Sequence, residues 1–123
     1  MRATLKIKKN NVFRYILKKG KYVKGKYIVV HISDKKVIKK QLSNINYLGI
    51  CVSKKNGNSV NRNKLKRWVR EAYKLEEIKL KKNFCIIILL KKNTTVQSAN
   101  FSVIREDMQK CFTELELYEI QIN

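Results

Sequence analysis

The chain has 123 residues, and its 29 lysines and arginines against 9 acidic residues give it a formal charge of +20 at pH 7. Apolar residues make up 44% of the sequence, which is typical of one folded domain and excludes a disordered chain. The excess of positive charge favours a polyanionic partner, which means RNA, DNA or an anionic membrane surface.

Four elements are expected in the first half of the chain. Asn10–Lys19 predicts a short helix, which Gly20 is expected to end in the left-handed conformation. Residues 26–32 are rich in β-branched side chains and predict a strand. A further short strand is expected within residues 37–42. Residues 47–53 predict another strand, whose even-numbered apolar positions face one side of a sheet.

Three elements are expected in the second half. Residues 61–74 predict a helix, because apolar side chains recur on one face from Leu65 to Tyr73. Phe84–Leu90 is a continuous apolar run, which is typical of a strand covered on both faces. A last helix follows Ser98 or Asn100. Its core face is predicted to hold Phe101, Ile104, Met108, Cys111, Phe112 and Leu115, and its outer face Glu106, Asp107, Glu114 and Glu116.

The order of these elements predicts a mixed α+β fold. A strand on each side of the helix at 61–74 indicates a βαβ crossover between two parallel strands. The whole chain is expected to form a two-layer α/β sandwich in the order α-β-β-β-α-β-α. The longest apolar run is too short to cross a bilayer, and the first residues lack the apolar core of a secretory signal. We therefore expect a cytoplasmic protein with no role for a membrane.

The helix at 61–74 carries most of the information about function. Its apolar stripe takes one side, and cations spread over the other, at spacings that suit successive phosphates. A merely solvated face usually mixes charges of both signs, whereas here one acid, Glu71, stands among eight basic residues between Lys54 and Lys74. The Asn56-Gly57-Asn58 turn before the helix also leaves backbone N–H groups available to a phosphate.

The sequence predicts no catalytic group and no metal site within the protein. The three cysteines, Cys51, Cys85 and Cys111, are far apart and flanked by apolar residues, so we expect reduced side chains. His31 is the single histidine and has no evident ligand or base partner.

The segment from Ser53 to Glu71 resembles the RNR motif of the bacterial ribonuclease P protein component. That motif has the form S-K-K-x-G-N-A-V-x-R-N-R-x-K-R-x-x-R-E. The matching residues here are Ser53-Lys54-Lys55, Gly57-Asn58-Ser59-Val60, Arg62-Asn63-Lys64, Lys66-Arg67 and Arg70-Glu71. The resemblance covers most of residues 5–90. Lys64 departs from it by replacing the usual second arginine, which removes a bidentate donor while keeping the charge.

The resemblance implies a single RNA-binding domain over 1–123, with a left-handed crossover carrying the basic helix. Physical rules alone favour the right-handed form. It further implies a subunit of an endoribonuclease that removes the 5′ leader of precursor tRNA. The implied partners are ribonuclease P RNA and precursor tRNA, with no obligate protein partner. RNA would be the catalyst, and Mg²⁺ would be bound mainly through the RNA.

The resemblance also implies two sets of binding residues. Contacts to the catalytic RNA are expected from Lys54, Lys55, Asn58, Arg62, Asn63, Lys64, Lys66, Arg67 and Arg70. A cleft for the leader, between the first helix and the sheet, is expected to use Phe13, Leu17, Tyr27, His31, Cys51 and Ser53. At His31 relatives often have a tyrosine.

Two other classes of protein remain open at this point. A structural RNA-binding protein of the ribosomal type would carry the same charge, although it would not explain the ordered spacing of the motif. A helix-turn-helix DNA-binding protein is disfavoured, because the basic helix follows a strand and a turn rather than a packed helix.

Overall fold

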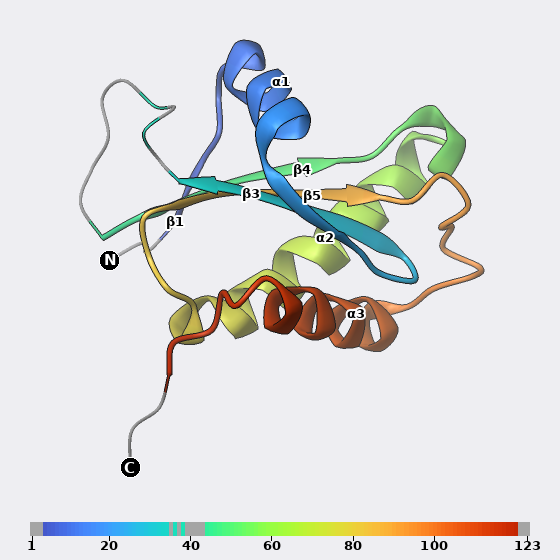
Figure 1. Ribbon diagram of the computed structural model, residues 1–123. Helices are drawn as coiled ribbons and strands as arrows, with labels where there is room; N and C mark the ends of the chain where they lie inside the picture. Colours follow the sequence, from blue (N-terminus) through green and yellow to red (C-terminus); the bar gives the residue numbers. More distant parts are fainter. Residues whose placement is uncertain (1–3, 35, 37, 39–43, 121–123) are drawn as a thin grey trace.

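The computed structural model describes residues 4–34, 36, 38 and 44–120, and it shows a five-stranded sheet with helices on both faces (Figure 1). The strands are β1 (Thr4–Lys6), β2 (Lys21–Lys24), β3 (Ile28–Asp34), β4 (Asn46–Cys51) and β5 (Phe84–Leu90). The α-helices are α1 (Asn10–Lys19), α2 (Ser59–Glu76) and α3 (Phe101–Glu114). Two 3₁₀ helices, η2 (Lys54–Asn56) and η3 (Glu77–Lys79), precede and follow α2. The predicted α+β class is confirmed.

The strands stand in the order β1-β4-β5-β3-β2, so β5 lies in the middle of the sheet. β4 and β5 are parallel neighbours joined by α2, which confirms the predicted βαβ unit. β1 also runs parallel to β4, whereas β2 and β3 add an antiparallel side. The handedness of the crossover stays a prediction.

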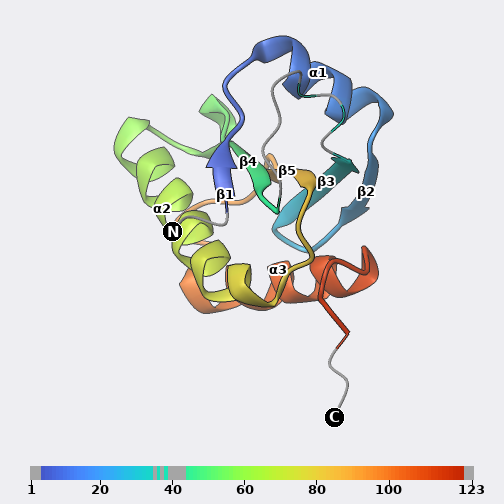
Figure 2. The same ribbon diagram turned by 90° about the vertical axis from the view of Figure 1, so that its left-hand side faces the viewer.

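The central strand separates two apolar clusters, as its continuous apolar sequence predicts. On one face Ile86 and Ile88 pack with α2 and α3, and on the other Cys85 and Ile87 pack with α1. Figure 2 shows α1 on one side of the sheet and the other two helices on the opposite side. α1 therefore lies outside the two-layer unit formed by the sheet, α2 and α3, and the space between α1 and the sheet is a separate surface.

Two strands that the sequence did not indicate complete the sheet. β1 has three residues, and its partners in β4 lie 42 positions further along the chain, beyond the reach of local periodicity. β2 reads Lys-Tyr-Val-Lys, and its charged ends suit the sheet edge that it occupies. The strand expected within residues 37–42 lies outside the described residues, apart from Ile38.

The prediction that Asp107 faces solvent is wrong. Asp107 is 6% exposed, and its carboxylate accepts hydrogen bonds from the backbone N–H groups of Lys26, Tyr27 and Ile28 at 2.8–3.1 Å. The chain turns between β2 and β3 at this point and leaves three donors without strand partners. Asp107 satisfies them from α3, which is a buried polar role that helical periodicity does not reveal.

Gly20 ends α1 as expected but in an extended conformation, with φ −70° and ψ 156°, so the predicted left-handed end is wrong. Its small size matters for another reason. A Cβ atom here would lie 2.5 Å from the oxygen of Ile16 and 2.7 Å from the oxygen of Ile32. The glycine therefore allows the chain to leave α1 directly into β2.

Candidate nucleic-acid interface

The start of α2 is fixed by side chains of the motif. Asn58 is the N-cap, and its side chain accepts a hydrogen bond from the N–H of Asn61 at 2.9 Å. Gly57 has φ +132°, a conformation that side-chain-bearing residues rarely adopt. Asn58 was predicted to contact RNA, and the structure gives its side-chain oxygen a capping role.

Asn56 anchors the loop that precedes α2. It is fully buried, and its amide nitrogen donates to the carbonyl oxygens of Lys91 at 2.7 Å and Thr94 at 2.8 Å. Its side-chain oxygen accepts from the N–H of Ser53 at 2.9 Å. Lys54 and Lys55, which lie between these two residues, are thereby held exposed beside the helix start. The local sequence indicates only a turn at Asn56, because its hydrogen-bond partners lie 35 and 38 residues away.

The cations of α2 form a row along the helix. Arg62, Lys66, Arg70 and Lys74 are spaced by four residues, which places them about 6 Å apart along one side of the axis. Arg70 and Lys74 are exposed, whereas Arg62 and Lys66 are half-buried. Three charged residues predicted from the motif, Arg62, Lys66 and Arg70, thus lie in one row, and Lys74 extends this row beyond the motif.

The remaining predicted residues of the motif flank this row. Asn63 and Arg67 are exposed, and Arg67 lies 3.9 Å from Glu71, a loose pair on the surface. The ammonium of Lys64 stands 5.4 Å from the centre of the Trp68 ring. Most of the basic charge on α2 is thus left available to a ligand.

A second surface lies between α1 and the sheet. The Phe13 ring rests on Gly49 of β4, where a side chain would overlap it. Leu17 and Cys51 pack into the same cluster as Phe13. Burial raises the pKa of the Cys51 thiol, partly opposed by the charge of Lys66, so the thiol stays protonated at neutral pH. Phe13, Leu17 and Cys51 are therefore brought together on one face, as predicted.

His31 lies further along this face, on β3 opposite Ile87 of β5. Its ring stacks on Tyr22 of β2, with centroids 5.2 Å apart and planes inclined by 26°. Burial lowers the pKa of His31, which favours the neutral ring at pH 7. Tyr22 is 54% exposed and was not among the predicted residues. The pair offers an aromatic surface of the kind on which bases stack.

Two of the predicted cleft residues lie elsewhere. Tyr27 packs against the cluster on the opposite face and lines a small hollow with Val103 and Lys110 of α3. It falls in the turn before β3, so the alternation of the strand does not apply to it. Ser53 follows β4, and its hydroxyl accepts from the N–H of Lys55 at 3.3 Å, which joins it to the loop before α2.

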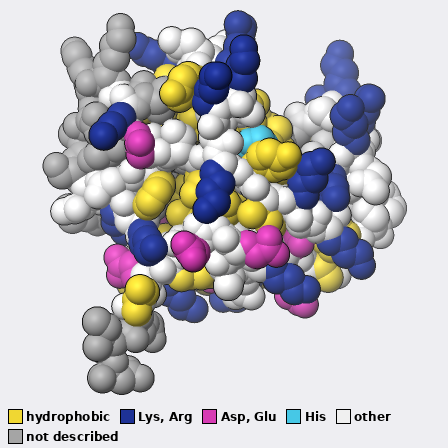
Figure 3. All heavy atoms as spheres, viewed as in Figure 1, with side chains coloured by type: hydrophobic (Ala, Val, Ile, Leu, Met, Phe, Trp, Pro, Cys, Tyr) yellow, Lys and Arg dark blue, Asp and Glu magenta, His cyan; other side chains and the backbone are white. Residues whose placement is uncertain are grey.

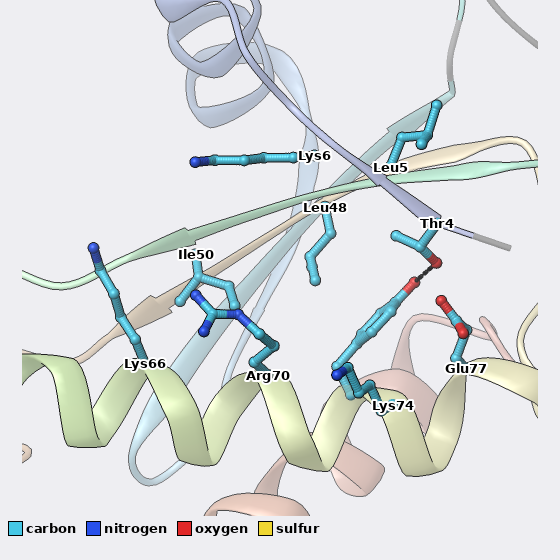
Figure 4. A pocket seen from close by; sticks show the side chains of 10 residues that line it. Thr4, Leu5, Lys6, Leu48, Ile50, Lys66, Arg70, Lys74 and Glu77 are labelled. Carbon is cyan, nitrogen blue, oxygen red and sulfur yellow. Dashed lines mark hydrogen bonds between the residues drawn. The ribbon is translucent and has the colours of Figure 1, made fainter. Parts of the chain in front are cut away.

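A groove that the sequence did not indicate runs between β1 and α2 (Figure 4). It has a volume of about 420 Å³. Leu48 and Ile50 point into it from β4, and Lys66 and Arg70 extend towards it from the helix. At one end, Thr4 and Tyr73 share a hydrogen bond of 2.8 Å between their hydroxyl groups. The groove depends on β1, whose three residues have no recognisable strand pattern, so the sequence did not predict it.

Charge divides the surface of the protein. Residues 1–100 contain 27 basic and 4 acidic side chains, and residues 101–123 contain 2 basic and 5 acidic ones. On the side shown in Figure 3, most acidic side chains gather over α3, while lysines and arginines dominate elsewhere. The described residues contain no group of three or more acidic, histidine or cysteine side chains placed to hold a metal ion. None of the helices in the described part of the chain is long and apolar enough to cross a membrane.

Comparison with known proteins agrees with this arrangement. The family model for ribonuclease P matches residues 1–116. The chain belongs to the ribonuclease P protein family. The ribonuclease P protein component of Alkaliphilus metalliredigens is 32% identical over 112 residues, covering 86% of this chain and 96% of the relative. That of Clostridium acetobutylicum is 32% identical over 112 residues, covering 91% and 89%.

Solved structures of ribonuclease P proteins have the same fold. The protein from Staphylococcus aureus aligns with a TM-score of 0.76 at 31% identity, over 93% of this chain and 97% of that one. The protein from Thermotoga maritima aligns with a TM-score of 0.71 at 28% identity, over 85% and 92%. The family role of this chain is therefore that of a protein component of ribonuclease P, the tRNA-processing ribonuclease whose RNA is its partner.

Proposed function

We propose that this chain binds ribonuclease P RNA through the basic side of α2 and the single-stranded 5′ leader of precursor tRNA through the surface beneath α1. The observation that carries this proposal is the row of cations on α2, which the Asn56 and Asn58 contacts hold in a fixed orientation. Arginine and lysine in such a row neutralise successive phosphates. β4 connects the two surfaces, because its last residue, Cys51, packs in the cluster of Phe13 and the chain then continues through Ser53 towards α2.

The leader surface suits a single strand rather than a duplex. Phe13, His31 and Tyr22 present rings along one face of the sheet, and single-stranded RNA binds where bases stack beside cations. Because Gly49 has no side chain, the Phe13 ring can lie close to the sheet. The surface therefore recognises RNA by stacking and charge, with little demand for a particular base.

The chain is proposed to assist hydrolysis that the RNA carries out. We propose that Mg²⁺ is bound mainly through the RNA, where it would supply charge stabilisation and an activated water for the hydrolysis. The cations of α2 that would face the RNA carry ammonium and guanidinium groups, which do not ligate Mg²⁺. Their part is to hold the RNA phosphates and position the leader.

The test of this assignment is the dependence of affinity on the leader. Precursor tRNA and mature tRNA are titrated onto the complex of this chain with ribonuclease P RNA. We expect the leader to strengthen binding, and Phe13→Ala to reduce that advantage more than Tyr15→Ala, which alters an exposed ring on the same helix. Equal affinity for both tRNAs, with tight binding to the ribonuclease P RNA retained, would favour a structural RNA-binding role instead.

A further inference from the structure

We propose that the groove between β1 and α2 binds one unstacked nucleotide of the partner RNA, with its base on Leu48 and Ile50 and its phosphate on Lys66 and Arg70. This inference rests on the proposed function, because the nucleotide belongs to an RNA already held by α2. The α2 surface otherwise recognises the charge of the RNA. The proposed groove would also let this surface recognise the shape of the RNA.

The size of the groove fits a nucleotide. Its volume of about 420 Å³ lies within the range of roughly 300–1,000 Å³ that is usual for small-ligand sites. β1 pairs with β4 only as far as Leu48, so β1 ends at this position of the sheet. Ile50, two residues further along β4, is half-buried beside the opening. A planar base can therefore enter beside Lys6 and lie against the two aliphatic side chains (Figure 4).

The groove has an aliphatic part and a basic part, which suit the planar base and the anionic phosphate of a nucleotide. One wall is aliphatic, and the other carries Lys66, Arg70 and Lys74. None of these three has an ion-pair partner within the described part of the chain, so their charge is available to a phosphate. An arginine also offers two parallel N–H donors to phosphate oxygens. Glu77 is the one acidic lining residue, and it lies at the Thr4 end, away from Lys66.

Contacts between β1 and α2 keep the groove open without a ligand. The hydrogen bond between Thr4 and Tyr73 ties β1 to α2 at the closed end. Tyr73 is 2% exposed, so it forms part of the packed wall and does not itself move into the space. A preformed cavity avoids the ordering cost that a mobile site has to overcome on binding.

The position of the groove identifies RNA as the source of the nucleotide. Lys66, Arg70 and Lys74 belong both to its wall and to the cation row of α2, so a strand that follows this row passes the opening. Proteins that recognise RNA commonly capture bases that have left the stack. The side chains of Leu48 and Ile50 offer no polar group to a base, so contact with them is tolerant of the kind of base.

The first experiment uses the unmodified chain with isotope-labelled leucine and isoleucine methyl groups. Uridine 5′-monophosphate, uridine, inorganic phosphate and a diglutamate peptide are titrated separately, and NMR shifts are recorded. We expect the nucleotide to shift the methyl signals of Leu48 and Ile50 in a saturable manner and phosphate to leave them nearly unchanged. No shift of these methyl groups with nucleotide, or equal shifts with diglutamate, would overturn the inference.

The second experiment fills the groove. Ile50→Phe places a larger apolar side chain in it, and Ile120→Phe makes the same change at a position that is 83% exposed, outside both the groove and the motif. We expect Ile50→Phe to lower the affinity for ribonuclease P RNA about tenfold relative to Ile120→Phe, while salt-sensitive binding of a short single-stranded RNA persists. Equal affinities of the two folded variants for ribonuclease P RNA would overturn the inference but leave the proposed function intact. Failure of the unmodified chain to bind that RNA would refute both. If Ile50→Phe does not fold, the methyl titration decides.

Discussion

The Phe13 ring lies so close to Gly49 that a β-carbon on the glycine would overlap it. This contact joins α1 to β4 and sets the distance between the helix and the sheet. Leu17 and Cys51 belong to the same cluster as Phe13, so the glycine affects the shape of the proposed leader surface beneath α1. Gly49, which has no side chain, thus determines where the Phe13 ring lies on the sheet.

The first prediction concerns this contact. Gly49→Ala is expected to displace the Phe13 ring and to destabilise the fold by about 1–3 kcal/mol, because it overpacks a well-filled site. The loss of stability is measured by urea unfolding, and the affinity for precursor tRNA with and without its leader is measured on the assembled enzyme. We expect the leader to contribute less in the variant. An unchanged leader contribution would show that Phe13 does not carry it.

The second prediction concerns the anchor of the loop before α2. Asn56→Ala removes a donor to Lys91 and Thr94 and an acceptor for Ser53, all in a buried position. Leaving such groups unpaired costs about 1–3 kcal/mol, and we expect a loss of that size in urea unfolding. Asn63→Ala, at an exposed position of α2, is the control for stability. Similar stability of the two variants would contradict the anchoring role.

The third prediction concerns the cations of α2. Arg70→Ala is expected to weaken binding to ribonuclease P RNA and to reduce the steepness of its salt dependence by about one phosphate contact. Lys110→Ala removes the same charge from the exposed surface of α3, away from the motif. We expect this control to have a much smaller effect. Equal effects would mean that total charge, rather than the arrangement on α2, determines affinity.

The fourth prediction concerns Glu76, which is 1% exposed at the end of α2. Burial alone would raise the pKa of Glu76, but hydrogen bonds from Arg105, Tyr118 and Gln109 outweigh burial and hold it below its usual 4.5. The ionised carboxylate therefore adds stability above about pH 4.5, and this contribution disappears as the pH falls through the lowered value in the folded state.

Urea unfolding of Glu76→Gln between pH 7 and pH 3 tests this account. We expect the variant to be about 1–3 kcal/mol less stable at pH 7 and to lose less further stability on acidification than the unmodified chain. Glu114→Gln, at an exposed position of α3, serves as the control. Parallel curves for the variant and the unmodified chain would show that Glu76 does not contribute to acid sensitivity.

Local pattern was sufficient for α1, α2 and β5. Asn10–Lys19 and Phe84–Leu90 have the predicted bounds, and α2 extends the predicted 61–74 by two residues at each end. The signals are strong because each segment keeps one pattern throughout: helical spacing of apolar residues in the two helices and a continuous apolar run in β5. The cation row followed from the same periodicity, so this part of the site was predictable.

Features that depend on distant partners were not predictable. Asp107 looked like a solvent-facing acid because its three donors lie about 80 positions away, in the turn before β3 and at the first residue of β3. Tyr27, which the resemblance implied for the leader cleft, lies in the turn before β3 and packs against the cluster on the opposite face. The groove needs β1, whose three residues carry too little pattern to be recognised.

A timed cleavage reaction tests most directly whether this chain promotes removal of the 5′ leader by ribonuclease P RNA. The chain, a bacterial ribonuclease P RNA and labelled precursor tRNA are mixed at low Mg²⁺, and release of the 5′ leader is followed with each component omitted in turn. We predict rapid release with all components, slow release without the protein and none without the RNA. Release that the protein does not accelerate, although it binds the RNA tightly, would contradict the claim.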